Sequence, residues 1–240
     1  YSMTKKVINQ NTKLDVELIN SIESKYIFSK NPINRIKKKM FEEVTQLDKK
    51  LALSNLSKKI SSIENCDLKK NAKQIVLGCG NINSPLMLIG GTPNVQEDIS
   101  GLPFEGEVGN LLKKMLSAIN INDENVYLSY AINFRPPNDR KPTSAEIKRY
   151  SNFLQEHISI INPKIIVLMG STAMEALTGL NNKISNERGK WKDIIIKNTS
   201  LPLLITFSPS YLLRYPENKK YSWEDLKKIN QKIQDLKIQI

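Results

Sequence analysis

The 240-residue chain is poor in the side chains that most often hold metals or build disulfide frameworks, with only two cysteines, Cys66 and Cys79, and one histidine, His157. Two cysteines cannot form a disulfide framework, and their scarcity favours a reducing, cytoplasmic setting. The sequence contains no run of 18 or more apolar residues, so we expect no membrane-spanning helix and no membrane partner. Its first residues also lack a charged-then-apolar signal segment.

Arginine is scarce as well, at six residues against 30 lysines in a chain whose formal net charge is +12. A basic excess suits a polyanionic partner such as nucleic acid. The chain also has 30 isoleucines and 25 asparagines, however, and this compositional bias offers a second explanation for the charge. Four arginines fall in turn-like segments, where the planar guanidinium suits phosphate or carboxylate: Arg135, Arg140, Arg188 and Arg214.

The first quarter of the chain differs from the rest. Residues 1–60 are rich in lysine, contain no glycine and have one proline, Pro32. The spacing of apolar residues predicts helices over residues 14–27 and 36–56. We therefore divide the chain into a Lys-rich helical extension over residues 1–60 and a main domain over residues 61–240.

In the main domain, short apolar runs alternate with segments of helical spacing. Strands are predicted over residues 86–89, 126–132, 165–169 and 203–207. One intervening helix is expected to begin at a Ser144 cap and to stop at Asn162-Pro163. Such alternation predicts an α/β fold: a three-layer αβα sandwich with a central four-stranded parallel sheet, preceded by the helical extension.

Three unusual segments each follow a predicted strand directly. They are GGTPNVQEDISGLPFEGEVG at 90–109, NFRPPNDRKP at 133–142 and SPSYLLR at 208–214. Ligands of parallel sheets bind beyond the carboxyl ends of the strands, so we expect these segments to converge on one site. Glycine and proline in the first segment would let the backbone approach a ligand closely.

Together these segments resemble the motifs of the iron–sulfur (family 4) class of the uracil-DNA glycosylase superfamily, in the same order and over roughly residues 60–235. The resemblance implies a protein that binds double- or single-stranded DNA, flips a base out of the helix and hydrolyses its N-glycosidic bond. It places Pro93 and Phe104 in the base pocket, with Phe104 at the position that stacks on uracil. Glu97 matches an acidic position of that family and is the candidate catalytic carboxylate.

The resemblance also implies a DNA-contacting surface. Its residues come from the second and third segments: Arg135, Arg140, Ser210, Leu212, Leu213 and Arg214. Leu212 and Leu213 are apolar where a loop should be polar, so we expect them to be exposed and to act as a wedge in a duplex.

Several positions depart from the family pattern. Gly91 replaces a glutamate, and Asn94 replaces a glycine. Tyr130 stands in the base pocket where the family has the asparagine that reads uracil, and Ser208 stands at the position of the histidine that hydrogen-bonds the departing base. Ser208 remains a catalytic candidate at that position, although a hydroxyl is a weaker donor than an imidazole. His157, which lies inside a predicted helix, is interpreted as structural.

The positions of the family's cluster ligands depart further. The resemblance places its four cysteines at Ile63, Cys66, Phe134 and Tyr150, so one thiol remains. Because an iron–sulfur cluster needs four good ligands, we predict no cluster and no other metal. The replacements are apolar or aromatic, and we expect them to fill the space by packing.

Three hypotheses about function remain open. The chain is a glycosylase with weak or altered activity on uracil or another damaged base; a catalytically inactive DNA-binding relative; or a protein-partner module that docks through the Lys-rich extension. We expect a monomer in each case.

Overall fold

The computed structural model describes residues 46–240. The helix expected over residues 14–27 lies outside this range, as does the first part of the helix expected over residues 36–56. The helix that the structure shows in this region is α2 (Gln46–Ser61), which ends five residues beyond the expected boundary. None of the helices in residues 46–240 is long and apolar enough to cross a bilayer.

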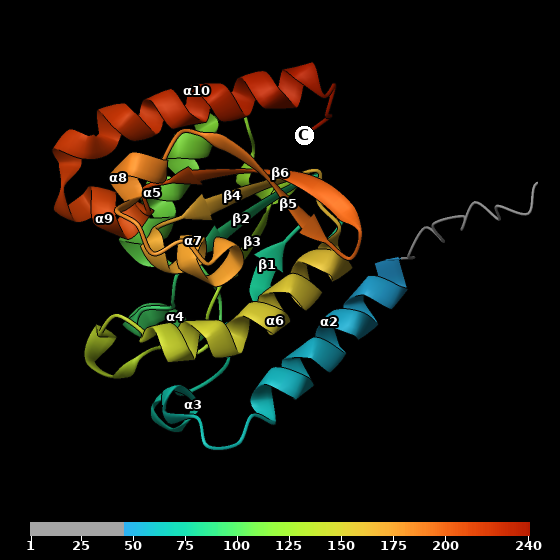
Figure 1. Cartoon of the computed structure of the whole chain (residues 1–240), viewed down its shortest axis with the longest axis vertical. Helices are drawn as coiled ribbons and strands as arrows, with labels where there is room; N and C mark the ends of the chain where they lie inside the picture. Colours follow the sequence, from blue (N-terminus) through green and yellow to red (C-terminus); the bar gives the residue numbers. More distant parts are fainter. Residues whose placement is uncertain (1–45) are drawn as a thin grey trace, which may run out of the picture. The chain divides into compact units, whose positions relative to one another are not determined.

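Figure 1 shows a central sheet with helices on both sides. The strands are β1 (Gly78–Gly80), β2 (Leu86–Gly90), β3 (Tyr127–Tyr130), β4 (Ile165–Met169), β5 (Trp191–Ile196) and β6 (Thr199–Thr206). Their order is β1-β3-β2-β4-β6-β5. The four central strands are parallel, as predicted, whereas β1 and β5 pair antiparallel at the two edges and were not predicted.

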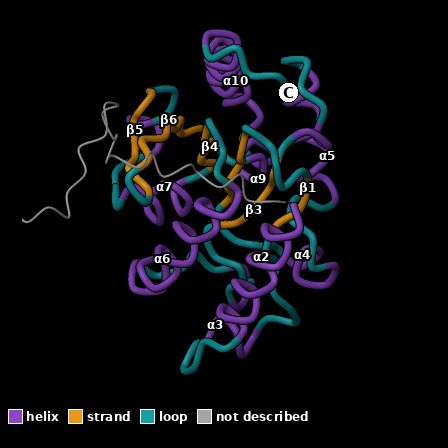
Figure 2. Tube along the Cα trace, turned by 90° about the vertical axis from the view of Figure 1, so that its right-hand side faces the viewer, coloured by secondary structure: helices purple, strands orange, loops and turns teal. Residues whose placement is uncertain are grey.

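The two faces of the sheet are covered by different helices, which confirms the three-layer arrangement (Figure 2). Helices α6 (Ser144–Ile161) and α7 (Ser171–Thr178) pack on one face, while α5 (Gly106–Ser117) and α10 (Lys219–Asp235) pack on the other. Strands β2 and β4 are buried at every position, because helices cover both faces.

Short helices and caps occupy the connections. These elements are α3 (Asp67–Asn71), α4 (Val95–Ser100), α8 (Ile184–Glu187), α9 (Pro209–Arg214), and the 3-10 helices η1 (Asp123–Asn125), η2 (Pro137–Asp139) and η3 (Pro216–Asn218). Helix α6 ends at left-handed Asn162, as expected, but its N-cap is Thr143 rather than Ser144. The Thr143 hydroxyl accepts from the backbone of Glu146, whose carboxylate accepts from the backbone of Thr143 in return.

Helix α2 packs against α6 and adds Leu53, Leu56 and Ile60 to the core on that face. Lys49 donates a hydrogen bond to the Ile161 carbonyl at 2.8 Å. The division at residue 60 between an extension and a main domain stays a prediction, with these contacts made by the described end of the extension.

Candidate active site

The segments that follow β2, β3 and β6 enclose one cavity of about 740 Å³ at the carboxyl edge of the sheet, as predicted. This volume lies within the range of small-molecule sites. Nine of the predicted site residues line it: Pro93, Glu97, Phe104, Tyr130, Arg140, Ser208, Ser210, Leu213 and Arg214. The other two, Arg135 and Leu212, do not line it.

Glu97 lies in the first turn of α4 and is fully buried. Its Oε2 accepts a hydrogen bond from the backbone of Asn94 at 2.7 Å, and its Oε1 accepts one from the Tyr130 hydroxyl at 2.7 Å. Burial raises the pKa of the Glu97 carboxyl, and the hydrogen bonds from Asn94 and Tyr130 partly oppose that rise. Each carboxylate oxygen of Glu97 therefore already accepts a hydrogen bond from the protein.

Tyr130 ends β3 and packs against the aromatic ring at the predicted base-stacking position. Its ring stacks on Phe104 with centroids 4.8 Å apart and an interplanar angle of 26°. The two residues are 4% and 7% exposed, so each ring covers much of the other. Gly90 makes room for this pair, because a Cβ there would lie 2.4 Å from Tyr130 Cε1 and 2.9 Å from Phe104 Cζ.

Phe104 itself adopts a left-handed backbone with φ of 58°, which is uncommon for a bulky residue. A Cβ at Gly109 would lie 1.7 Å from the Phe104 carbonyl oxygen, so only glycine fits there. The helix that follows the first motif thus supports the unusual turn that directs Phe104 toward the cavity. This backbone conformation is part of the site's construction.

Ser208 caps α9 at the opposite wall of the cavity. Its Oγ accepts a hydrogen bond from the backbone of Tyr211 at 3.2 Å and lies 3.1 Å from the Ser210 Oγ. Ser208 is half-buried, whereas Ser210 is exposed. The hydroxyl at the position of the family's histidine is therefore engaged in capping a helix.

The expectation that Leu212 is exposed is wrong. The segment expected to be a loop is helix α9, and Leu212 is 1% exposed on its inner side. Leu213 is half-buried and lines the cavity, and Arg214 is exposed at its rim. Arg214 makes no ion pair with any residue between 46 and 240, so its guanidinium is available to a ligand.

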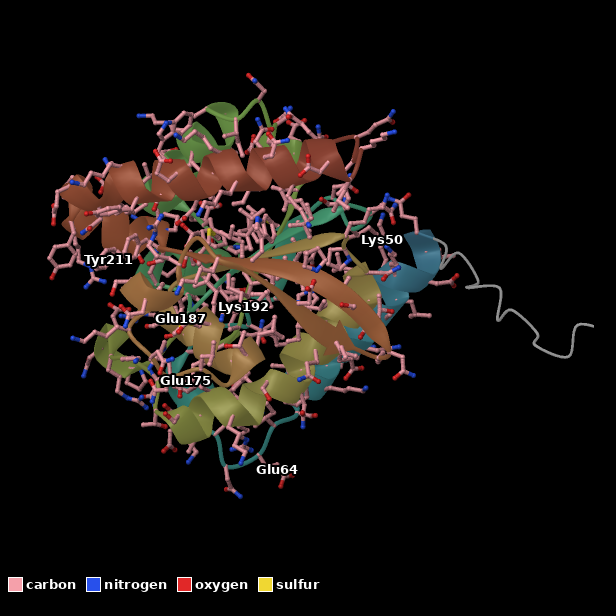
Figure 3. All side chains as sticks on the ribbon, turned by 45° about the horizontal axis from the view of Figure 1, so that its top comes forward. Lys50, Glu64, Glu175, Glu187, Lys192 and Tyr211 are labelled. Atoms are coloured by element: carbon pink, nitrogen blue, oxygen red, sulfur yellow. The ribbon has the colours of Figure 1, made fainter. Side chains whose placement is uncertain are left out.

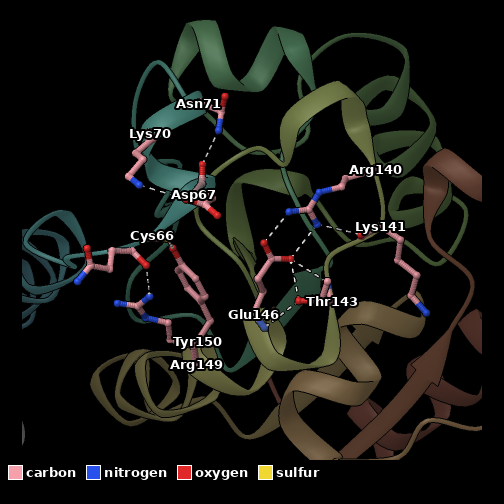
Figure 4. A network of polar contacts seen from close by, with 11 residues as sticks. Cys66, Asp67, Lys70, Asn71, Arg140, Lys141, Thr143, Glu146, Arg149 and Tyr150 are labelled. Atoms are coloured by element: carbon pink, nitrogen blue, oxygen red, sulfur yellow. Dashed lines mark hydrogen bonds and ion pairs between the residues drawn. The ribbon is translucent and has the colours of Figure 1, made fainter.

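Arg135 and Arg140 are both paired within their own loop. Arg135 forms two hydrogen bonds with Asp139, at 2.7 and 3.0 Å. Arg140 holds Glu146 through both terminal nitrogens, at 2.6 and 2.8 Å (Figure 4). The hydrogen bond from Arg140 lowers the pKa of the Glu146 carboxyl to about 2. These arginines brace the proline-rich turn, and Arg140 also lines the cavity.

The structure adds a buried ion pair that the motifs did not identify. Asp225 in α10 is fully buried, accepts from Arg188 Nε at 3.0 Å, and accepts from the Thr206 hydroxyl at 2.7 Å. The Arg188 guanidinium lies 5.6 Å from the centre of the Phe207 ring. This pair fixes the end of β6, from which Ser208 follows. The sequence feature that could have indicated this ion pair is Asp225, an acidic residue within the apolar stripe of α10.

The positions that match the family's cluster ligands lie in or against the hydrophobic core. Phe134 and Tyr150 are buried, and Ile63 packs on the same cluster. The Cys66 sulfur lies 3.4 Å from the Tyr150 hydroxyl (Figure 4). Among residues 46–240 no three His, Cys, Asp or Glu side chains are grouped closely enough to hold a metal ion. One thiol among aliphatic and aromatic groups does not fit a four-thiolate cluster.

His157 is buried in α6, away from the residues that line the cavity. Its Nε2 lies 2.9 Å from the Tyr127 hydroxyl, and its Nδ1 lies 3.3 Å from the Ser129 hydroxyl. Burial lowers the pKa of His157 to about 4. These contacts agree with the interpretation of His157 as structural.

The motifs, the parallel sheet and the cavity at its carboxyl edge are those of a DNA-glycosylase fold. A profile of the uracil DNA glycosylase superfamily matches residues 77–234, and the chain belongs to that superfamily. It is similar to proteins named type-4 uracil-DNA glycosylase. That of Thermotoga maritima is 35% identical over 176 residues, which cover 72% of this chain and 90% of the relative. That of Archaeoglobus fulgidus is 30% identical over 184 residues, covering 75% and 92%.

Proposed function

We propose that this chain is a DNA-binding, glycosylase-like protein whose release of uracil is weak or absent because Tyr130 closes the base pocket. One observation carries the proposal. The Tyr130 ring stacks on Phe104, the residue expected to stack on uracil, while its hydroxyl holds the buried Glu97. A base that entered the site would have to displace an aromatic ring already packed there.

The other replaced positions support the same proposal. The Ser208 oxygen accepts the hydrogen bond that caps α9, and its hydroxyl is a weaker donor to a departing base anion than an imidazole. Loss of one donor to a developing anion costs about 10²–10³ in rate. At Gly91, where the family has a glutamate, a Cβ would lie 3.0 Å from the Thr172 Cβ, so a side chain there would need Thr172 to shift.

We propose further that the protein holds no iron–sulfur cluster. The support is the packing of Phe134 and Tyr150 in the core, with Cys66 against the Tyr150 hydroxyl. Burying each large apolar side chain contributes roughly 1.5–3 kcal/mol by transfer estimates. Packing of this kind offsets part of the stability that a cluster provides.

A second candidate function is excision of a different damaged base. The observation in its favour is the cavity of about 740 Å³ that remains beside the Tyr130–Phe104 stack. Polar side chains such as Thr92, Asn94 and Thr172 line it and could hydrogen-bond a base. Assays on oligonucleotides that each carry one of several damaged bases distinguish this candidate from an inactive binder.

The proposal about uracil is tested by reopening the pocket. We expect Tyr130→Asn combined with Ser208→His to raise uracil release at least about tenfold, a fraction of what one anion donor is worth. Adding Glu97→Ala should abolish the gain if the carboxylate supports water or the sugar cation. Glu97→Gln is its matched control, because an amide can still accept from the Asn94 backbone and preserve the cap of α4.

Robust uracil release by the natural chain would contradict the proposal that Tyr130 closes the pocket. A double variant that folds and binds DNA but stays inert would favour the inactive binder over the weak glycosylase. Circular dichroism and thermal unfolding of each variant separate loss of chemistry from loss of fold.

A further inference from the structure

A second hollow continues from the candidate active site. This groove has a volume of about 720 Å³ and runs between the α7–α8 connection and the start of α10. It shares five lining residues with the cavity: Lys141, Ser171, Ile184, Phe207 and Tyr211. Because the two hollows share a wall, a chain-like ligand with one unit in the cavity can extend directly into the groove.

The groove is lined by basic side chains and by no acidic ones. Lys141 and Lys183 are exposed along it and form no ion pair with any residue in the described part of the chain. Arg188 also lines it but is neutralised by Asp225. Glu187 lies close by and is paired with Lys192 at 3.0 Å (Figure 3). Two uncompensated lysines therefore give the groove a positive potential that attracts polyanions.

Aromatic rings form the other wall. Phe207 stacks on Tyr211 with centroids 4.9 Å apart, and Tyr211 packs on Tyr215 at 4.8 Å. Tyr221 lines the groove, is 43% exposed, and has the Arg188 guanidinium 5.3 Å from its ring centre. The Lys220 ammonium lies 5.0 Å from the centre of the same ring and adds a positive charge. Exposed aromatics beside cations are the pattern of single-strand binding surfaces.

We infer that this groove binds the nucleotides next to the base held at the cavity, as a single DNA strand, with phosphates at Lys141 and Lys183 and a base against Tyr221. The DNA must be single-stranded in the groove, because in a duplex the neighbouring bases cover both faces of a base and leave none for the Tyr221 ring. Charge alone would suit any polyanion, whereas the exposed ring selects a partner with flat aromatic units. The inference rests on the proposed function and adds to it the form of the DNA.

The test measures DNA binding by fluorescence anisotropy, with a labelled deoxythymidine 15-mer, the same strand in a duplex, and a uridine 15-mer. The variant Lys141→Gln with Lys183→Gln removes both groove charges. Its control, Lys164→Gln with Lys197→Gln, removes two exposed lysines at the amino ends of β4 and β6, on the opposite edge of the sheet. Tyr221→Ala removes the ring, and Tyr221→Phe keeps it. Polyglutamate of similar length reports attraction by charge alone.

We expect the natural chain to bind the single deoxythymidine strand more tightly than the duplex, the uridine strand or polyglutamate. The groove variant should lower the slope of log affinity against log salt by about 1.4, at 0.7 per phosphate contact, and the control should leave most of the slope intact. Tyr221→Ala should weaken single-strand binding about fivefold or more, and Tyr221→Phe should bind like the natural chain.

The single-strand assignment would be overturned if the groove variant lost as much affinity for the duplex as for the single strand. It would also be overturned if the groove variant bound the single strand as tightly as the natural chain does. Tighter binding of the uridine strand would overturn the assignment to DNA, and equal binding of polyglutamate would overturn nucleic-acid recognition. These outcomes leave the proposed function intact if Tyr130→Asn with Ser208→His still raises uracil release. If the natural chain bound no DNA, both the groove inference and the proposed function would be contradicted.

Discussion

The hydrogen bond between Tyr130 and Glu97 gives the sharpest single test of how the pocket is held closed. Tyr130→Phe deletes one oxygen atom, keeps the ring stacked on Phe104, and leaves Glu97 Oε1 buried without its 2.7 Å donor. A buried polar group that loses its partner costs about 1–3 kcal/mol. We therefore expect the free energy of unfolding to fall by that amount, with uracil release unchanged because the ring still fills the pocket.

The direction in which stability changes with pH follows from the raised pKa of the Glu97 carboxyl. A carboxyl whose folded pKa lies above its unfolded value is destabilising when charged, so stability is lost as pH rises through the folded pKa. Removing the Tyr130 donor disfavours the charged carboxylate further. The stability difference between the natural chain and Tyr130→Phe should thus be small near pH 4 and largest near pH 8.

Urea unfolding followed by tryptophan fluorescence measures these differences, since Trp191 is half-buried and Trp223 is partly exposed. In a double-mutant cycle with Glu97→Gln, the amide oxygen can still accept from Tyr130, so the cycle isolates the part of the pair energy that depends on the carboxylate charge. We expect a coupling energy of at least about 0.5 kcal/mol for residues in contact. Additive effects, or a Tyr130→Phe variant as stable as the natural chain at pH 8, would refute the closed-pocket reasoning.

Three further expectations concern the rest of the molecule. His157 has a folded pKa of about 4, below its unfolded value of 6.5, so stability of about 3 kcal/mol is present above pH 6.5 and is lost as pH falls toward 4. His157→Gln should abolish this loss, measured as the difference in the free energy of urea unfolding between pH 7 and pH 4. Protein purified without oxygen should be folded, colourless and iron-free, and stoichiometric iron with a visible charge-transfer band would contradict the packing argument. DNA binding should weaken steeply as salt rises, and Arg214→Ala should lower the slope of log affinity against log salt by about 0.9 for a duplex in anisotropy titrations. An affinity that does not change with salt concentration would rule out phosphate contacts by this arginine.

The central strands could be predicted because each is a short apolar run buried by helices. The edge strands lack that signal. Strand β1 is three residues long and reads Gly-Cys-Gly. Strands β5 and β6 are joined by Lys197 and Asn198, both with left-handed backbones, which form the tight turn of a hairpin. The usual glycine of such a turn is missing, so no local pattern indicates the hairpin.

The convergence of the three motifs could also be predicted, because the order of strands and loops determines it. The contacts inside the site could not. Tyr130 and Glu97 are 33 residues apart, and nothing local indicates that the hydroxyl of one reaches the carboxylate of the other. A loop conformation would expose Leu212 and Leu213 together, which is the basis of the wedge prediction. In helix α9, consecutive residues point about 100° apart, so one faces the core when the other faces the cavity.

The two regions that depart most from the family pattern share one physical solution. At the predicted cluster positions the remaining thiol, Cys66, lies against the hydroxyl of buried Tyr150, and in the base pocket the carboxylate Glu97 accepts from the hydroxyl of buried Tyr130. In each place a tyrosine supplies apolar volume to the core and one polar atom to the reactive group beside it. An alanine would leave a cavity, and a phenylalanine would leave the thiol or the carboxylate without that neighbour. Under the proposal above, this pairing keeps both regions packed without a cluster or a base-reading asparagine, and the DNA-binding surface is retained while uracil release is weak or absent.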